Sequence, residues 1–181
     1  HLPQDEPTDA VPLNDLVRSH LKIPGSRALK EDRILLDMQA TDVESTLAEL
    51  VGPIARKTLL LDVQDLKKRL KDREDLLSTG VGHGVAIPHP RDPVPTLREP
   101  CVLVVGRHPD GIEYGAVDGR PVRLFFLLCC QNIQLHLHMM ARLARLLQEP
   151  EFIDGCLTAE EPEDVMRVVL ESERRHFLER S

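Results

Sequence analysis

Residues 122–130 read VRLFFLLCC, a run in which Arg123 is the sole charged residue. A second apolar run, CVLVV, occupies residues 101–105. Both runs lack the alternation of apolar and polar residues that marks a half-exposed strand, and this is typical of strands buried on both faces. The two runs therefore predict the central strands of a sheet that helices cover on each side.

The segments around these runs predict the covering helices and the remaining strands. Thr41 and Glu44 have the spacing of a capping box, so we expect a helix to begin at Thr41. Further helices are expected from Asp62 to about Ser78, from Asn132 to about Gln148, around residues 151–157 and from Pro162, with short strands at 34–38, 85–88 and 112–114. The order of elements predicts an α/β fold, a three-layer α/β/α sandwich with a mixed central sheet of four to five strands.

Length and composition predict one domain with a short extension. The chain has 181 residues, and domains cluster at about 100 to 150 residues. Residues 1–28 contain four prolines and scattered charges, so we expect an N-terminal extension or linker there. Residues 29–181 are then the domain.

Charge and cysteine usage limit the class of protein. The 23 basic and 30 acidic residues give a net charge of −7, whereas a nucleic-acid binder would carry clustered basic residues. No apolar stretch approaches the ~20 residues of a membrane-spanning helix, and the start of the chain lacks a signal-peptide pattern. Cys101, Cys129, Cys130 and Cys156 form no Cys-x-x-Cys pair, so we expect reduced thiols and a cytoplasmic location.

The segment STGVGHGVAIPHP, residues 78–90, places His89 between two prolines at a predicted strand end. Pro90 disfavours the helical conformation for His89, and Pro88 fixes its own φ, so the imidazole has few directions in which to point. Such preorganisation suits a nucleophile that is approached from one side. Near its ordinary pKa of ~6.5, histidine keeps one ring nitrogen with a free lone pair. The alternative is a histidine that only ends a strand.

A second histidine pattern lies in QLHLHMMARLARLL, residues 134–147. Side chains two residues apart are separated by about 200° around the helix axis, so His136 and His138 cannot bind one metal ion from the same face of the helix. His138 continues into Arg142 and Arg145 at helical spacing and is expected to be exposed, whereas His136 is expected on the side that faces the sheet. There it is either a satisfied core histidine or the wall of a cleft. The free N–H groups of the first helical turn favour an anion such as phosphate nearby.

Together these motifs resemble the enzyme IIA domain of the phosphotransferase system, in its fructose/mannitol class including the nitrogen-regulatory branch (the EIIA type-2 domain). The resemblance covers about residues 30–174. It rests on Arg73 with Glu74, the glycine-rich segment up to His89, GIEYGAVDGRPVRLFFLL at residues 111–128, His136 with Leu137, and ARLARLL at residues 141–147.

The resemblance implies a phosphoryl-transfer function. His89 would take a phosphoryl group from the phosphocarrier protein HPr or its relative, as a phosphohistidine on Nε2. His136 would line the catalytic site and hydrogen-bond the phosphorylated ring or its phosphate, and Arg73 would make charge-assisted contacts to the phosphate. The onward partner would be an EIIB-type domain or a regulated target protein. No metal or organic cofactor is implied.

One residue departs from the family pattern and keeps other hypotheses open. The family usually has glycine after the active histidine, whereas Pro90 removes a backbone N–H group. The chain is therefore either a phosphotransferase component or a non-catalytic regulatory domain of a transporter or signalling protein that binds a partner. A zinc hydrolase that uses His83, His89, His136 and His138 is a third hypothesis, and the helical separation of the last two argues against it.

Overall fold

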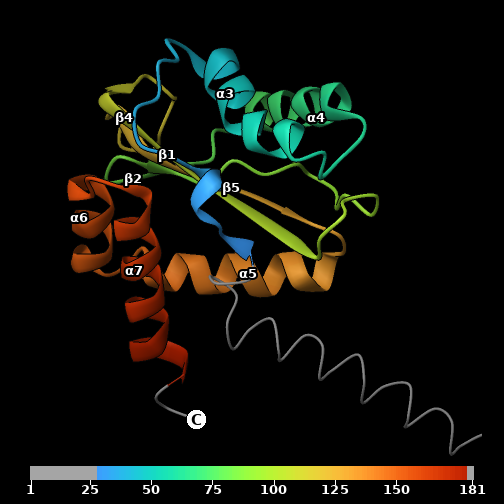
Figure 1. Cartoon of the computed structure of the whole chain (residues 1–181). Helices are drawn as coiled ribbons and strands as arrows, with labels where there is room; N and C mark the ends of the chain where they lie inside the picture. Colours follow the sequence, from blue (N-terminus) through green and yellow to red (C-terminus); the bar gives the residue numbers. More distant parts are fainter. Residues whose placement is uncertain (1–27, 179–181) are drawn as a thin grey trace, which may run out of the picture.

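The computed structural model describes residues 28–178, and its centre is a five-stranded sheet in the order β1-β4-β5-β3-β2 (Figure 1). The strands span Ile34–Leu35 (β1), Gly80–Gly82 (β2), Val85–Ala86 (β3), Cys101–Ile112 (β4) and Val122–Cys130 (β5). The helices span Val43–Arg56 (α3), Val63–Leu76 (α4), Ile133–Leu146 (α5), Pro150–Thr158 (α6) and Pro162–Glu173 (α7), with a 3-10 turn at Glu31–Arg33 (η1) and a π-helical turn at Arg174–Leu178 (η2).

The sheet is mixed, as predicted. β4 and β5 form its antiparallel centre. β1 adds to β4 and β3 adds to β5 in parallel, while β2 pairs antiparallel with β3 at the edge. β2 was not predicted, because three glycines between residues 80 and 84 carry no strand signal.

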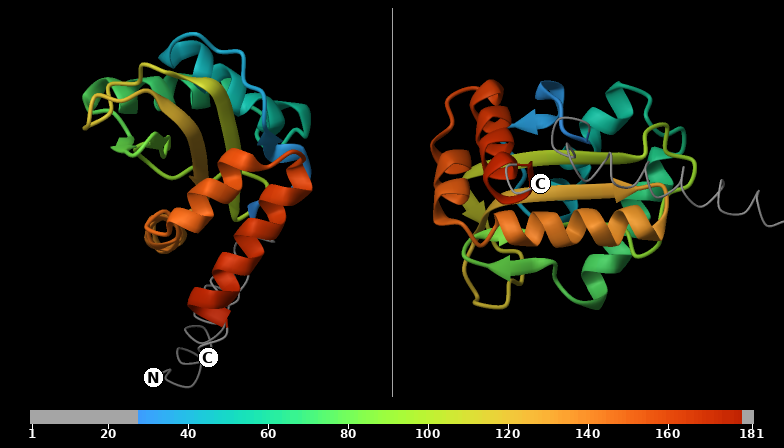
Figure 2. Two further views of the ribbon diagram at one scale, coloured as in Figure 1. Left: turned by 90° about the vertical axis from the view of Figure 1, so that its left-hand side faces the viewer. Right: turned by 90° about the horizontal axis from the view of Figure 1, so that it is seen from below.

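The apolar run of β5 supplies two cores, because successive side chains of a strand point to opposite faces. Phe125 and Leu127 lie in the cluster that α3 and α4 cover. Phe126 and Leu128 lie in the cluster that α5, α6 and α7 cover. Figures 1 and 2 show α3 and α4 over one face of the sheet and α5 along the other. The three-layer α/β/α prediction is therefore confirmed.

The helix starts follow side-chain capping. Asp62 and Asn132 cap α4 and α5, as predicted, by accepting the N–H of the residue three positions later. The predicted start of α3 was wrong by one residue. Asp42, and not Thr41, is the cap, and it exchanges hydrogen bonds with Ser45, whose N–H lies 2.8 Å from Asp42 Oδ1. Aspartate one position downstream offers the stronger, charged acceptor.

The predicted strand between residues 112 and 114 is not separate. β4 continues to Ile112 through a register irregularity after Arg107, so the hairpin begins later than expected. β3 is shorter than predicted, since Pro88 has no N–H with which to extend a ladder. The predicted extension, residues 1–28, lies outside the described residues except for Ala28, and that boundary stays a prediction. None of the described helices is long and apolar enough to cross a membrane.

Candidate functional site

His89 follows the end of β3 and lies at the end of the sheet where β5 stops and α5 begins. The Pro88 carbonyl accepts the Leu128 N–H over 3.0 Å, so the chain before His89 still runs beside β5. Pro90, directly after it, is buried. Both flanking prolines are thus held in place, and the backbone of His89 is fixed between them.

A main-chain hydrogen bond fixes the tautomer of His89. Its Nδ1 lies 2.7 Å from the Ile87 carbonyl oxygen. Because a carbonyl only accepts, Nδ1 carries the proton and Nε2 keeps the lone pair when the ring is neutral. Burial lowers the pKa of His89, and the positive charge of Arg73 adds to this, while the bond to Ile87 opposes it. The neutral, nucleophilic form is therefore favoured at neutral pH.

The ring of His136 lies beside that of His89. The two ring centroids are 5.2 Å apart, and the ring planes are inclined by 43°. His136 is half-buried in the first turn of α5, next to the Asn132 cap, and burial followed by the neighbouring His89 lowers its pKa. The two histidines that the sequence predicted at one site are therefore neighbours at the start of this helix.

The orientation of α5 differs in detail from the prediction. Its buried side chains are Leu135, Met139, Leu143 and Leu146. His136 is half-buried at the edge of this stripe, which disfavours the alternative of a core histidine.

The remaining predicted histidines lie apart from this pair. His138 is exposed, as expected. His83 is exposed on the β2–β3 turn with a left-handed φ of 58°, and Asp118 accepts its N–H over 2.9 Å. Among residues 28–178, no group of three His, Cys, Asp or Glu side chains is placed to hold a metal ion. The zinc hypothesis therefore has no ligand set in the described part of the chain.

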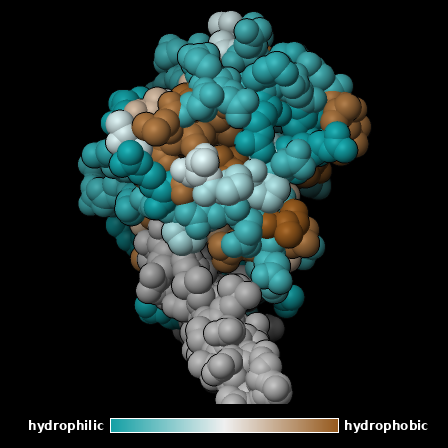
Figure 3. Space-filling model, turned by 90° about the vertical axis from the view of Figure 1, so that its right-hand side faces the viewer, coloured by the Kyte–Doolittle hydropathy of each residue, from teal (hydrophilic) through white to brown (hydrophobic). Residues whose placement is uncertain are grey.

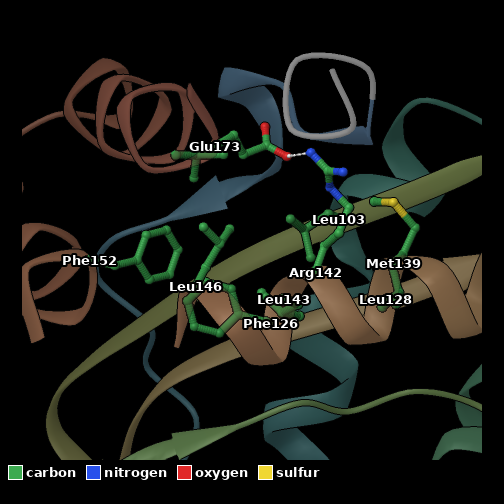
Figure 4. A pocket seen from close by; sticks show the side chains of 10 residues that line it. Leu103, Phe126, Leu128, Met139, Arg142, Leu143, Leu146, Phe152 and Glu173 are labelled. Atoms are coloured by element: carbon green, nitrogen blue, oxygen red, sulfur yellow. Dashed lines mark ion pairs between the residues drawn. The ribbon is translucent and has the colours of Figure 1, made fainter. Parts of the chain in front are cut away.

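Arg142 was expected to be exposed with His138, and this was wrong. Its side chain is only 12% exposed and forms an ion pair of 3.7 Å with Glu173 of α7. The pair borders a small apolar cavity of about 30 Å³ between α5, α7 and the sheet (Figure 4). Neither His89 nor His136 lines this cavity. It is separate from the histidine site.

Comparison with known proteins matches residues 27–172 to one family model, described as the phosphoenolpyruvate-dependent sugar phosphotransferase system, EIIA 2. The chain belongs to this EIIA 2 family. The sequence-based resemblance to the EIIA type-2 domain is therefore confirmed.

The relatives of this EIIA chain include nitrogen regulatory proteins and components of sugar phosphotransferase systems. The nitrogen regulatory protein of Escherichia coli is 31% identical over 127 residues, which are 69% of this chain and 77% of the relative. The fructose-specific EIIABC component of Bacillus subtilis is 29% identical over 143 residues, 78% of this chain. The match spans only 22% of that larger relative.

Solved structures share the fold. The nitrogen regulatory protein IIA-Ntr from Neisseria meningitidis has a TM-score of 0.72 at 28% identity, with 81% of this chain and 99% of that one covered. The mannitol-specific IIA domain of E. coli, solved as a complex with phosphorylated enzyme IIB, has a TM-score of 0.69 at 17% identity, with 79% and 97% covered. The second likeness concerns the fold alone.

Arg73 of this EIIA chain acts electrostatically on His89, but its side chain faces the end of its own helix. Its guanidinium donates to the Leu77 carbonyl over 2.6 Å, and the residue as a whole is half-buried. Its charge lowers the pKa of His89, which indicates proximity. It is therefore held near the site and is more constrained than a freely solvated helix arginine.

Sequence reasoning missed a buried network beneath the site. Glu74 accepts the Thr79 N–H over 2.9 Å and the Tyr114 hydroxyl over 3.0 Å, and the Thr79 hydroxyl also bonds to it. Burial and the Glu74 carboxylate raise the pKa of Tyr114 well above its usual range, so the phenol remains a donor. The Thr79 carbonyl accepts the Ile87 N–H over 3.0 Å. The network thus reaches the residue that holds the ring of His89.

An apolar rim accompanies the histidine pair. Ile133 and Leu137 flank His136 on α5, and Leu76 and Leu77 end α4 beside Arg73; all four are strongly exposed. Figure 3 shows the end of the molecule at which α5 begins, where apolar surface interrupts the hydrophilic surface. Large exposed apolar side chains beside a candidate site are candidates for contact with a partner protein.

Proposed function

We propose that this chain accepts a phosphoryl group on Nε2 of His89 from HPr or a related phosphocarrier, and passes it to an EIIB-type domain or signals with it. One observation carries the proposal: the Ile87 carbonyl holds the Nδ1 proton of His89, which leaves Nε2 as the nucleophile, and the ring of His136 lies 5.2 Å away, centroid to centroid. Membership of the EIIA 2 family supports it.

In the proposed transfer, the Nε2 lone pair attacks the phosphorus of the donor phosphohistidine. The donor N–P bond breaks, and its electron pair stays on the donor imidazole. The proton stays on Nδ1 of His89 and remains hydrogen-bonded to the Ile87 carbonyl throughout, so the ring needs no proton transfer before attack. The energetic contribution of the protein is positioning and charge stabilisation, as is general for phosphoryl transfer.

In this proposal, His136 and Arg73 bind and stabilise the transferred phosphoryl group. An imidazole N–H of His136 would donate to a phosphoryl oxygen, and the Arg73 cation would offset the negative charge. The N–H groups of Ile133 and Gln134 belong to the first turn of α5 and have no acceptor within the helix. They are candidates to replace the N–H that Pro90 lacks.

The test is phosphoryl acceptance. The full chain is incubated with phosphorylated HPr, and the product is analysed by intact mass and peptide mapping. We expect one phosphoryl group on wild type, none on His89→Ala, and wild-type labelling on His138→Ala, a matched exposed histidine. Equal labelling of wild type and His89→Ala would reject the assignment.

A second candidate function has a specific observation in its favour. Pro90 is buried beside His89 and cannot donate a hydrogen bond, so the site suits a regulatory domain that binds a partner without turnover. In that case the same assay gives no labelling of folded wild type. Both functions place the chain in the cytoplasm with its phosphocarrier, and neither requires nucleic acid, membrane insertion or a cofactor.

A further inference from the structure

Two cysteines face each other where β4 begins and β5 ends. Cys101 and Cys130 are register partners in the antiparallel ladder. At the next position the Gln131 N–H donates to the Pro100 carbonyl over 2.9 Å. Hydrogen-bonded and non-hydrogen-bonded pairs alternate in such a ladder, so Cys101 and Cys130 form a non-hydrogen-bonded pair.

The other edge of β5 agrees with this assignment. The Leu128 N–H donates to Pro88 over 3.0 Å, and the Cys130 carbonyl accepts the Val94 N–H over 2.9 Å. The main-chain polar groups of Leu128 and Cys130 therefore point away from β4. At a non-hydrogen-bonded position the Cα atoms lie about 4.5 Å apart, within the span of about 4.4–6.8 Å that a disulfide bridges.

The side chains of Cys101 and Cys130 lie on the same face of the sheet, and both are buried. The two side chains belong to the apolar cluster that α5 covers, and the interaction with Cys101, followed by burial, raises the pKa of Cys130. Cys129 points to the opposite face, and Cys156 lies in α6. The chain thus offers one cysteine pair with disulfide geometry and two cysteines that serve as internal controls.

We propose that Cys101 and Cys130 form a reversible oxidation site that closes to an intrachain disulfide when a small peroxide reaches it. The thiolate of Cys101 attacks a peroxide oxygen and becomes a sulfenic acid, and the departing oxygen takes up a proton and leaves as water. Cys101 is the attacking residue because the raised pKa of Cys130 disfavours its thiolate. The second sulfur then attacks the sulfenic sulfur and releases its oxygen as a second water. Two thiols lose two electrons in total, and one hydrogen peroxide becomes two waters. A dithiol reductant restores the pair by thiol–disulfide exchange.

The cysteine pair lies close in the chain to both segments that carry the histidines. The Cys130 carbonyl anchors Val94 in the loop that follows His89. Cys130 also lies two residues before Asn132, the cap of the helix that carries His136. Closure of the disulfide therefore acts at the junction of the two segments that bear the histidines. The oxidation itself does not depend on the proposed function.

The experiment treats the reduced full chain with hydrogen peroxide, blocks remaining thiols with N-ethylmaleimide under denaturing conditions, and maps tryptic peptides by mass. We expect peptide 99–107 to be linked to peptide 124–142, and the link to disappear after dithiothreitol. Because the second peptide contains both Cys129 and Cys130, the decisive pair is Cys130→Ser, which should lose the link, against Cys129→Ser, which should keep it.

Three outcomes would overturn the proposal. The first is the absence of the link in wild type at peroxide concentrations that consume its thiols. The second is a link that persists in Cys130→Ser. The third is loss of the link in Cys129→Ser when the circular dichroism spectrum of that variant matches the wild-type spectrum. Cys156→Ser should keep the link as well.

Discussion

The hydroxyl of Tyr114 donates a hydrogen bond of 3.0 Å to the carboxylate of Glu74, and this bond joins the loop after β4 to α4. Both side chains are buried. Glu74 also accepts from Thr79, whose carbonyl holds the Ile87 N–H. Hydrogen bonds therefore run without interruption from Tyr114 to the main chain beside His89.

Tyr114→Phe is expected to lower the free energy of unfolding by about 1–3 kcal/mol, because Glu74 loses a donor that water cannot easily replace. Urea denaturation followed by circular dichroism measures this. The control is Val117→Ala, at a strongly exposed side chain of the same loop, which should change stability by no more than about 0.5 kcal/mol. Equal stability of Tyr114→Phe and wild type would show that the bond contributes nothing net.

The pH response follows from the lowered pKa values of His89 and His136. In the unfolded chain both titrate near ~6.5, and in the folded chain they titrate lower. The unfolded state then binds more protons in the window between the two values. Stability from these groups is complete above ~6.5 and falls as the pH decreases toward the folded pKa.

Phosphoryl acceptance requires neutral His89, so it should persist below pH ~6.5 and decline only at lower pH. Titration of the imidazole Cε1–H signals by NMR provides a direct check. Midpoints at or above ~6.5 for His89 would contradict the expected effect of burial.

His136→Ala should slow phosphoryl acceptance by about 10- to 100-fold, the effect of removing one hydrogen bond to a charged group. His138→Ala, on the exposed side of the same helix, should leave the rate unchanged. Single-turnover labelling with phosphorylated HPr gives both rates. If the two variants behave alike, His136 has no special role in transfer.

Leu137→Asp should weaken the interaction with the phosphoryl donor, because it places a charge in the exposed apolar rim next to His136. The midpoint of thermal unfolding should stay within a few degrees of wild type, since the side chain is 61% exposed. Leu170→Asp on α7 is the matched control and should bind as wild type does. Dependence of labelling rate on donor concentration separates weaker binding from slower transfer.

The fold was largely predictable because its strongest signals are local. An apolar run such as β5 is compatible with few environments, and prolines and caps mark helix starts within a residue or two. The Glu74–Tyr114 bond was not predictable, because it joins residues of different elements through tertiary packing. The same holds for Arg142, since a helical pattern shows which residues share a face but not that Glu173 of another helix will cover it.

For the site, the sequence identified both histidines of the close pair. The tautomer of His89 could not be predicted from the sequence. It depends on the Ile87 carbonyl, and a main-chain atom leaves no trace in residue identity.

The main-chain bond to His89 limits how the protein can diverge. The acceptor that orients His89 is an oxygen of the polypeptide backbone, so replacing the isoleucine side chain with another residue leaves that oxygen in place. A single substitution can change the side chains of the rim or of Arg73, but it changes the orientation of the imidazole only by moving the main chain at Ile87.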